Sequence, residues 1–335
     1  MELDLPLVWA LLIATAVFLY VVLDGFDLGL GILFPTARSG TERDVMMNSV
    51  APVWDGNETW LVLGGGGLYA VFPLAYAILM PALYAPIVAM LLGLVFRGVV
   101  FEFRFKASEE RRWIWDIAFF LGSLTAALAQ GIILGAIVQG IEVEGRAYAG
   151  GWLDWLTPFS LMTGVAVVIG YALLGATWLV WKCEGPMQDH FRHKAMMLMF
   201  AMLVVIGIVS LWTPALDPAI AARWFEVPQI FYTAPVPLMV LGLAVVLFRS
   251  LSGTRDVVPF LASLGLFLVT FAGLGISLYP NIVPPTITIW DAAAPDSSLA
   301  FLLAGAAVLI PMILAYSGYA YWIFRGKVRP GDGYH

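Results

Sequence analysis

Four carboxylates lie inside long apolar stretches near the start of the chain. Asp24 and Asp27 are three residues apart in VVLDGFDLGLG, and Asp55 and Glu58 are three residues apart in VWDGNETW. This spacing places both members of a pair on one face of a helix. Acidic groups that are close together and poorly solvated cannot all be ionised at low cost, so they suit the uptake and relay of protons. The pattern therefore indicates a proton-handling site.

The composition indicates where these carboxylates lie. Of the 335 residues, 61% are apolar and 12% are charged, against roughly 25% charged residues in an average soluble domain. We therefore expect an all-α polytopic membrane protein whose surroundings are a lipid bilayer, and we expect no nucleic acid partner. A carboxylate at mid-membrane costs about 2.5–3.5 kcal/mol, so it usually faces protein or water and has a role. The single cysteine, Cys183, excludes a disulfide framework and a Cys-ligated zinc or iron–sulfur site.

The sequence contains nine apolar runs that are long enough to cross a membrane as helices. A crossing helix needs about 20 mainly apolar residues, whereas a barrel strand would need only about ten residues of alternating polarity. The predicted spans are 7–33, 50–72, 74–100, 113–139, 158–181, 195–212, 231–249, 257–279 and 299–324.

Basic residues indicate how these spans are oriented. If the N-terminus is outside, all but Arg146 and Arg223 of the 17 Lys and Arg residues fall in inner connections, at inner helix ends or in the C-terminal tail. Short cytoplasmic loops carry the excess of Lys and Arg, so we expect a cytoplasmic C-terminus. The opening MELDLPLVWA has no basic segment and predicts a retained first span rather than a cleaved signal peptide.

Helix geometry predicts that the two carboxylate pairs meet. At about 1.5 Å per residue, Asp27 and Asp55 lie roughly 10 Å from the inner ends of their spans, and Asp24 and Glu58 roughly 14 Å. Consecutive helices with a short connection are usually neighbours. We therefore expect an acidic cluster near the inner surface, with at most one buried cation close by. The expected supporting residues are Trp54, Asn57, Trp60, Arg97 and Asp116.

A structural alternative accounts for Asp55 and Glu58. The pattern Asp55-x-x-Glu58 fits a capping box, with Asp55 at the N-cap and Glu58 at the third helical position. The second span would then begin near residue 56, and both acids would serve as caps. This alternative does not account for Asp24 and Asp27, because both lie in the middle of an apolar run. Trp54 and Trp60 could line a site, and packing within the protein is the alternative interpretation of both residues.

An internal similarity suggests duplication. The fourth and eighth spans align without gaps at an offset of 140, with Phe120-Leu121 matching Phe260-Leu261 and Gly135 matching Gly275. Parallel duplicated halves occur in membrane transporters, although shared composition is an alternative explanation. The predicted units are a first four-helix bundle over 1–140, a second over 141–280, and an outer loop, ninth helix and tail over 281–335.

Histidine placement argues against haem iron bound by this chain. The three histidines are His190, His193 and His335, and none falls within a predicted span. The first two fall in a predicted inner loop, and we expect neither haem ligation nor a zinc site there. No metal ligand set is predicted for this chain.

Several longer motifs resemble subunit II of cytochrome bd-type quinol oxidases. They occur in the same order as in the family, over nearly the whole chain. The segments GNETWLVLGG, GLGISLYP and IWDAAAP are most similar to the cyanide-insensitive branch of the family. The matching stretches are DGFDLGLGILFP (24–35), RDVMMNSVAPVWDGNETWLVLGG (43–65), FPLAYA (72–77), FRGVVFEFRFK (96–106), DWLTPFSL (154–161) and PPTITIWDAAAP (284–295).

The resemblance implies a complex in the bacterial cytoplasmic (inner) membrane. A partner, subunit I, would hold two b-type haems and a third haem of d or b type, oxidise ubiquinol or menaquinol at the outer face, and reduce dioxygen with cytoplasmic protons. Subunit II would be haem-free, with two four-helix bundles and a peripheral helix, and would support assembly and proton access. Asp55 matches the family acid on the proton route, and the roles of Asp24, Asp27 and Glu58 are less settled. A small single-helix accessory subunit and a quinone within subunit II are further features of some members.

Three hypotheses follow. The chain is a haem-free oxidase subunit that feeds protons to its partner, a proton-coupled transporter, or a purely structural assembly subunit. A transporter would purify alone and colourless, whereas an oxidase subunit would bring a haem-bearing partner with it.

Overall fold

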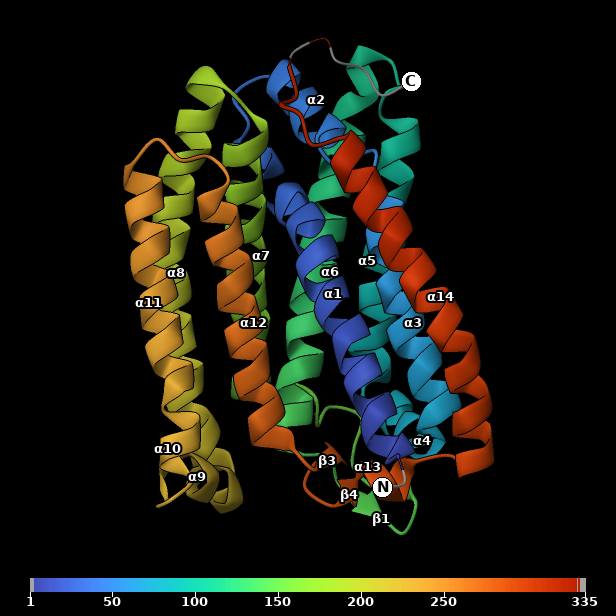
Figure 1. Ribbon diagram of the computed structural model, residues 1–335. Coiled ribbons are helices and arrows are strands. Elements are labelled where there is room, and N and C mark those ends of the chain that lie inside the picture. The colour runs from blue at the N-terminus through green and yellow to red at the C-terminus, as the bar shows by residue number, and fades with distance from the viewer. Residues whose placement is uncertain (1–2, 330, 332–335) are drawn as a thin grey trace.

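The computed structural model describes residues 3–329 and 331, and long helices account for most of this part of the chain (Figure 1). The long helices are α1 (Leu5–Leu33), α3 (Trp54–Val71), α5 (Tyr84–Phe103), α6 (Arg112–Gln139), α7 (Pro158–Lys182), α8 (Gly185–Leu216), α11 (Pro235–Ser252), α12 (Val258–Leu278) and α14 (Asp296–Ile323). The short elements are η1 (Phe34–Thr36), α2 (Gly40–Asn48), α4 (Pro73–Ala82), η2 (Glu109–Arg111), β1 (Val143–Glu144), β2 (Ala147–Tyr148), α9 (Pro218–Phe225), α10 (Ile230–Thr233), β3 (Asn281–Val283), β4 (Ile287–Thr288) and α13 (Ile289–Ala292).

Local sequence signals set several helix starts. The Asp4 side chain accepts a hydrogen bond from the Leu7 backbone N–H at the start of α1. Thr157 and Ser160 form a reciprocal capping box at the start of α7. Side-chain caps of this kind satisfy backbone N–H groups that have no partner within the helix.

The number of spans agrees with the prediction, but the third boundary is wrong. In the described residues, eight helices are long and apolar enough to cross a membrane, and nine crossings result if α3 and α4 count as one broken span. These two helices are bent by 118° at Phe72. Pro73 begins a separate helix, α4. The chain breaks a second time at Leu83, and α5 begins at Tyr84. The predicted span 74–100 is therefore two helices. The span predicted from residue 50 begins at Trp54.

The connections gather at two ends of the bundle. The α1 N-terminus, the β1–β2 and β3–β4 hairpins, α9 and α10 lie at one end, and α2 and the C-terminal segment lie at the other (Figure 1). All connections predicted to be inner share the second end. The basic residues are therefore segregated as the sequence predicts. His190 and His193 lie on the first turns of α8 rather than in a loop.

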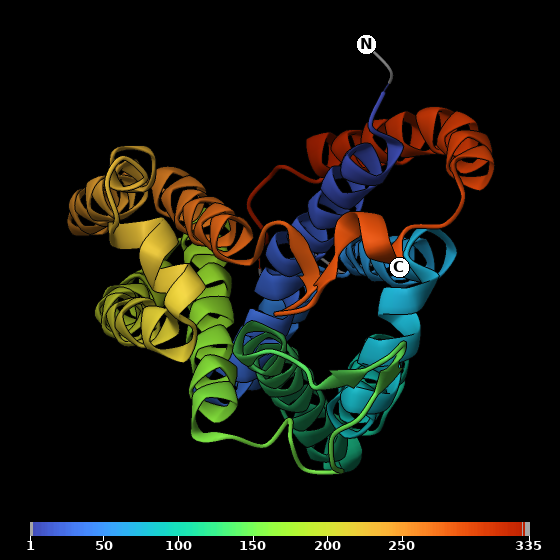
Figure 2. The same cartoon turned by 90° about the horizontal axis from the view of Figure 1, so that it is seen from below.

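Helix α1 occupies the centre of the molecule. It packs against α3, α6 and α7, and α14 covers its outer side together with α3 (Figure 2). A close α1–α7 contact is possible because a Cβ atom at Gly29 would overlap the carbonyl oxygen of Tyr171. Phe26 stacks on Trp178 across the same contact, with ring centroids 4.3 Å apart. Helices α7, α8, α11 and α12 form a second group, and the division at residue 140 stays a prediction.

Candidate functional site

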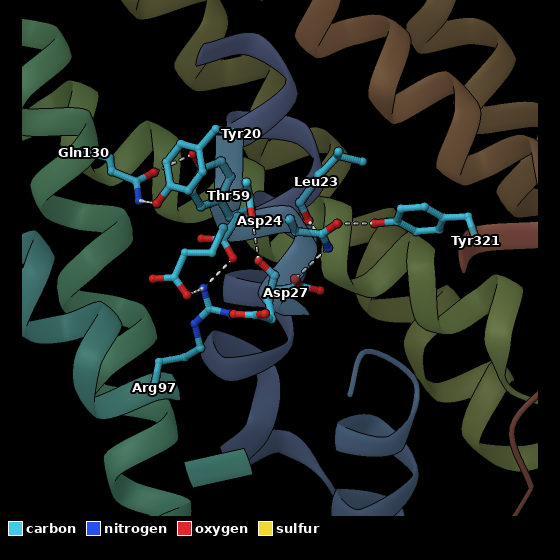
Figure 3. Close-up of polar contacts among 12 residues, drawn as sticks. Tyr20, Leu23, Asp24, Asp27, Thr59, Arg97, Gln130 and Tyr321 are labelled. Carbon is cyan, nitrogen blue, oxygen red and sulfur yellow. Dashed lines mark hydrogen bonds and ion pairs between the residues drawn. The ribbon is translucent and has the colours of Figure 1, made fainter. Parts of the chain in front are cut away.

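Arg97 lies at the centre of the predicted cluster. It projects from α5, and its guanidinium donates a hydrogen bond to Asp24 Oδ1 on α1 (Figure 3). Neither side chain is exposed to solvent. Glu58 on α3 is 3.7 Å from the same guanidinium nitrogen and is partly exposed. The prediction that Asp24, Glu58 and Arg97 converge is confirmed, and three different helices supply them.

Asp27 has a different set of partners. Its Oδ2 accepts a hydrogen bond of 2.8 Å from the Asn57 side chain, which also donates to the Leu23 carbonyl oxygen at 3.3 Å. The Asn57 carbonyl oxygen accepts a 2.6 Å hydrogen bond from the Tyr321 hydroxyl on α14 (Figure 3). Asp27 and Asn57 are buried. Asn57 on α3 therefore links a carboxylate on α1 to the hydroxyl of Tyr321 on α14.

A third polar branch connects α1 to α7, one helical turn from Asp24. The Tyr20 hydroxyl on α1 accepts a hydrogen bond from the Gln130 amide nitrogen on α6 at 2.7 Å. Tyr171 on α7 donates to the Gln130 oxygen at 2.6 Å. This chain of polar groups links α1, α6 and α7 beside the site.

Asp55 lies apart from these contacts. Its side chain is exposed, and no hydrogen bond or ion pair to it is found within the described residues. Successive helical residues are rotated by about 100°, so Asp55 is about 200° from Asn57 and points away from Asp27. The expected meeting of Asp55 with Asp27 is therefore wrong, and Asn57 takes that place.

The capping alternative for Asp55 and Glu58 is also wrong. The residue at the N-cap of α3 is Val53, and no side chain caps this helix. Asp55 lies in the first turn, and Glu58 turns towards Arg97.

Asp116 belongs to a separate ionic cluster at the inner end of the bundle. Its carboxylate accepts from Arg104 at 2.6 Å and from Arg43 at 3.1 Å. Arg104 also donates to Asp44 at 2.5 Å and is buried. This end therefore has a buried cation of its own, Arg104, because α2 folds back over it and brings Asp44 and Arg43 with it.

Trp54 and Trp60 differ in their relation to the site. The Arg97 guanidinium carbon lies 5.6 Å from the centroid of Trp54, whose ring stacks on Phe101. Trp54 therefore borders the site. Trp60 is buried against Ala16 and Tyr20 and has a packing role.

Several buried polar atoms of the cluster lack a protein partner among the described residues. They are Asp24 Oδ2, Asp27 Oδ1, and Nε and Nη1 of Arg97. Buried polar atoms almost always have a hydrogen-bond partner, which is often ordered water. The cluster therefore has the polarity that internal water requires.

Sequence reasoning missed four polar members of the site. Tyr20, Gln130, Tyr171 and Tyr321 all lie within long apolar helices. Hydroxyl and amide groups inside such helices usually need a polar partner, and that signal could have identified them as candidates.

The chain matches a known protein family over nearly its whole length. The model for "cytochrome bd terminal oxidase subunit II" matches residues 5–324. The chain belongs to this family. It is therefore a multi-pass cytoplasmic-membrane subunit of a quinol oxidase complex, which oxidises quinol, reduces dioxygen, contains haem and includes a subunit I partner.

Relatives of this subunit II match over almost their full length. Cytochrome bd-I ubiquinol oxidase subunit 2 of Escherichia coli K12 is 30% identical, with 98% of this chain and 96% of the relative covered. Cytochrome bd ubiquinol oxidase subunit 2 of Bacillus subtilis is 28% identical, with 96% of each chain covered. The structure of bd oxidase from Geobacillus thermodenitrificans contains a chain of the same fold, with a TM-score of 0.74, 18% identity, and coverage of 96% and 99%. Family membership removes the support for a proton-coupled transporter.

The two described histidines of this subunit II, His190 and His193, lie near the N-terminal end of α8. In the described part of the chain, no group of three or more His, Cys, Asp or Glu residues could hold a metal ion. Both ring nitrogens of His190 have partners, with Arg38 at 2.9 Å and the Thr36 carbonyl oxygen at 3.2 Å. His193 is exposed near the N-terminal end of α8. His335 lies outside the described residues.

Proposed function

We propose that this chain is the haem-free subunit of its oxidase and that it supplies protons from the cytoplasm to the oxygen-reducing site of subunit I. The observation that carries the proposal is the position of Asp55, which is exposed on α3 one helical turn from Glu58, the carboxylate that approaches the buried Arg97–Asp24 pair. Subunit I would hold two b-type haems and a third haem of d or b type.

The exposed face of α3 supports a partner beside Asp55. Asp55, Thr59 and Val62 follow one another at helical spacing and are all exposed. A carboxylate on a membrane-crossing helix is unfavourable towards lipid. We infer that subunit I covers this face, so Asp55 lies between the two subunits and can exchange protons with the partner.

Glu58, Arg97, Asp24 and Asp27 have distinct parts in the proposed route. Glu58 is partly exposed and lies one helical turn beyond Asp55, so it can pass a proton between Asp55 and the interior. Arg97 balances the negative charge that remains when a carboxylate releases its proton. Asp24 and Asp27 each present one oxygen without a protein partner among the described residues, and a proton can be held there.

The segregation of basic residues supports the orientation. With the N-terminus outside and the C-terminus in the cytoplasm, the end bearing α2 and Arg104 faces the cytoplasm. The acidic cluster then lies nearer to the side from which protons are taken, because Asp24 and Asp27 are closer to the inner end of α1 than to its outer end. The E. coli and B. subtilis relatives are named ubiquinol oxidases, and we propose ubiquinol or menaquinol as the reductant. A quinone within this chain, a small accessory subunit and the cyanide-insensitive branch stay predictions.

A purely structural role is the second candidate, and the fully buried Arg97–Asp24 pair favours it. In that case, variants at the cluster would lose haem during assembly but keep normal turnover per haem once assembled.

The deciding experiment replaces Asp55 with Asn in the complete complex. We expect normal haem content and oxygen consumption per haem reduced about tenfold or more, because a proton-transfer group typically contributes roughly 10²–10⁴-fold. Glu102→Gln is the matched control, since Glu102 is exposed near the same end and pairs with the exposed Lys106 at 3.2 Å. Normal turnover of Asp55→Asn would contradict the proposed route.

A further inference from the structure

The C-terminal strap, residues 324–329, ties the last helix to the second half of the molecule. Lys182 Nζ donates to the Phe324 carbonyl oxygen at 2.6 Å, and the Val328 N–H donates to the Lys182 carbonyl oxygen at 2.8 Å. Lys327 Nζ donates to the Cys183 carbonyl oxygen at 2.9 Å and to Asp256 at 2.7 Å. The inner end of α14 is therefore fixed in height and rotation.

This anchoring fixes the position of Tyr321, which lies in the last turn of α14. Its hydroxyl donates to Asn57 Oδ1, so the Asn57 amide nitrogen must face Asp27 and the Leu23 carbonyl oxygen. The opposite amide orientation would set oxygen against oxygen at both of those acceptors. Tyr321 thus determines which group Asn57 offers to Asp27.

The amide contact also distinguishes the two oxygens of Asp27. Oδ2 is occupied as an acceptor from Asn57, whereas Oδ1 is buried and has no protein partner among the described residues. A proton that binds to Asp27 must therefore bind at Oδ1. When it leaves from Oδ1, the carboxylate keeps its Asn57 donor.

We propose that Tyr321 is a positioning residue for proton transfer, acting through Asn57 to keep Asp27 Oδ1 as the exchanging oxygen. This inference rests on the proposed function and deepens it by naming the residue that determines which oxygen of Asp27 holds the proton. Tyr321 keeps its own proton throughout. The last helix and the strap thereby set the properties of a carboxylate on the first helix.

The test is Tyr321→Phe in the intact complex, which retains the ring and removes the hydroxyl. Losing one hydrogen bond of ordinary strength is expected to move the midpoint of the pH profile of oxygen consumption by about 0.5–1 unit, with turnover falling about threefold. Haem content should stay normal. Tyr319→Phe is the control, because Tyr319 lies on the same helix and is 59% exposed.

Two further results separate this inference from the proposed function. An unchanged pH profile in Tyr321→Phe, with slow turnover in Asp55→Asn, would overturn the role of Tyr321 alone. Normal turnover in both Asp55→Asn and Asp27→Asn would overturn the proton route itself. If Tyr321→Phe does not assemble, Asn57→Ser breaks the same link from α3, and it should shift the profile likewise; no shift would overturn the inference.

Discussion

Arg97 on α5 and Asp24 on α1 form an ion pair that is completely excluded from solvent. Removing two charges from water costs several kcal/mol per ion, and a close partner offsets that cost. The pair joins two helices that are far apart in sequence, and a third carboxylate, Glu58, approaches the same guanidinium. Within the pair, the Oδ2 atom of Asp24 and the Nη1 atom of Arg97 have no protein partner in the described chain. The pair is therefore both a structural link and part of a polar interior.

Replacing Arg97 should prevent assembly. Arg97→Met would leave Asp24 buried without its cation, and breaking a buried pair in this way costs about 3–5 kcal/mol. The yield of haem-containing complex and its thermal midpoint are the measurements. Arg111→Gln is the control, because Arg111 is exposed. A stable Arg97→Met complex would show that the pair does not contribute to the fold.

The sequence predicted the parts of the site that helix periodicity determines. Asp24, Glu58 and Arg97 converge because spacing and depth fix the face and height of a residue on a helix. Their partners across the bundle could not be predicted in the same way. The contact of Tyr321 with Asn57 depends on the rotation of α14, which packing and the strap determine.

The breaks in the fold were harder to predict than the helices. Residues 73–96 contain no charged residue, so hydropathy alone gives no sign of the turn at Leu83. The return of α2 over the inner end likewise depends on tertiary contacts, since Arg104 is the residue that binds both Asp44 and Asp116.

A methyl group at Gly29 should separate α1 from α7. Gly29→Ala places a Cβ atom against the backbone of Tyr171, and overpacking of this kind typically costs about 1–3 kcal/mol. Gly207→Ala is the matched control, because a Cβ there meets nothing within 4 Å and alanine is favoured over glycine in a helix by up to about 1 kcal/mol. Thermal unfolding of the complex distinguishes them. Equal thermal midpoints for the two variants would contradict the tight α1–α7 contact.

The strap should make a pH-dependent contribution to stability through Asp256. Burial alone would raise the pKa of Asp256, but hydrogen bonds from Lys327 and Gln188 and the charges of Lys327 and Arg192 lower it below its usual value. A carboxyl with a lowered pKa stabilises the folded state above its unfolded-state pKa of about 3.9, and this contribution is lost as the pH falls through the folded-state pKa.

Asp256→Asn should therefore lower the thermal midpoint at pH 7 by about 1–3 °C, as expected for a partly exposed ion pair. The difference from the unaltered complex should disappear as the pH falls well below 4, and Glu110→Gln, at an exposed position, should show no such pattern. A difference that persists at low pH would assign the effect to packing.

Proton uptake during a single turnover tests the central claim most directly. The fully reduced complex is mixed with oxygen in weakly buffered solution containing a pH indicator, while haem absorbance follows the oxygen chemistry. We expect Asp55→Asn to slow proton uptake by about tenfold or more without loss of haem, and Glu102→Gln to behave as the unaltered complex. Proton uptake at the unaltered rate in Asp55→Asn would contradict a route through this subunit.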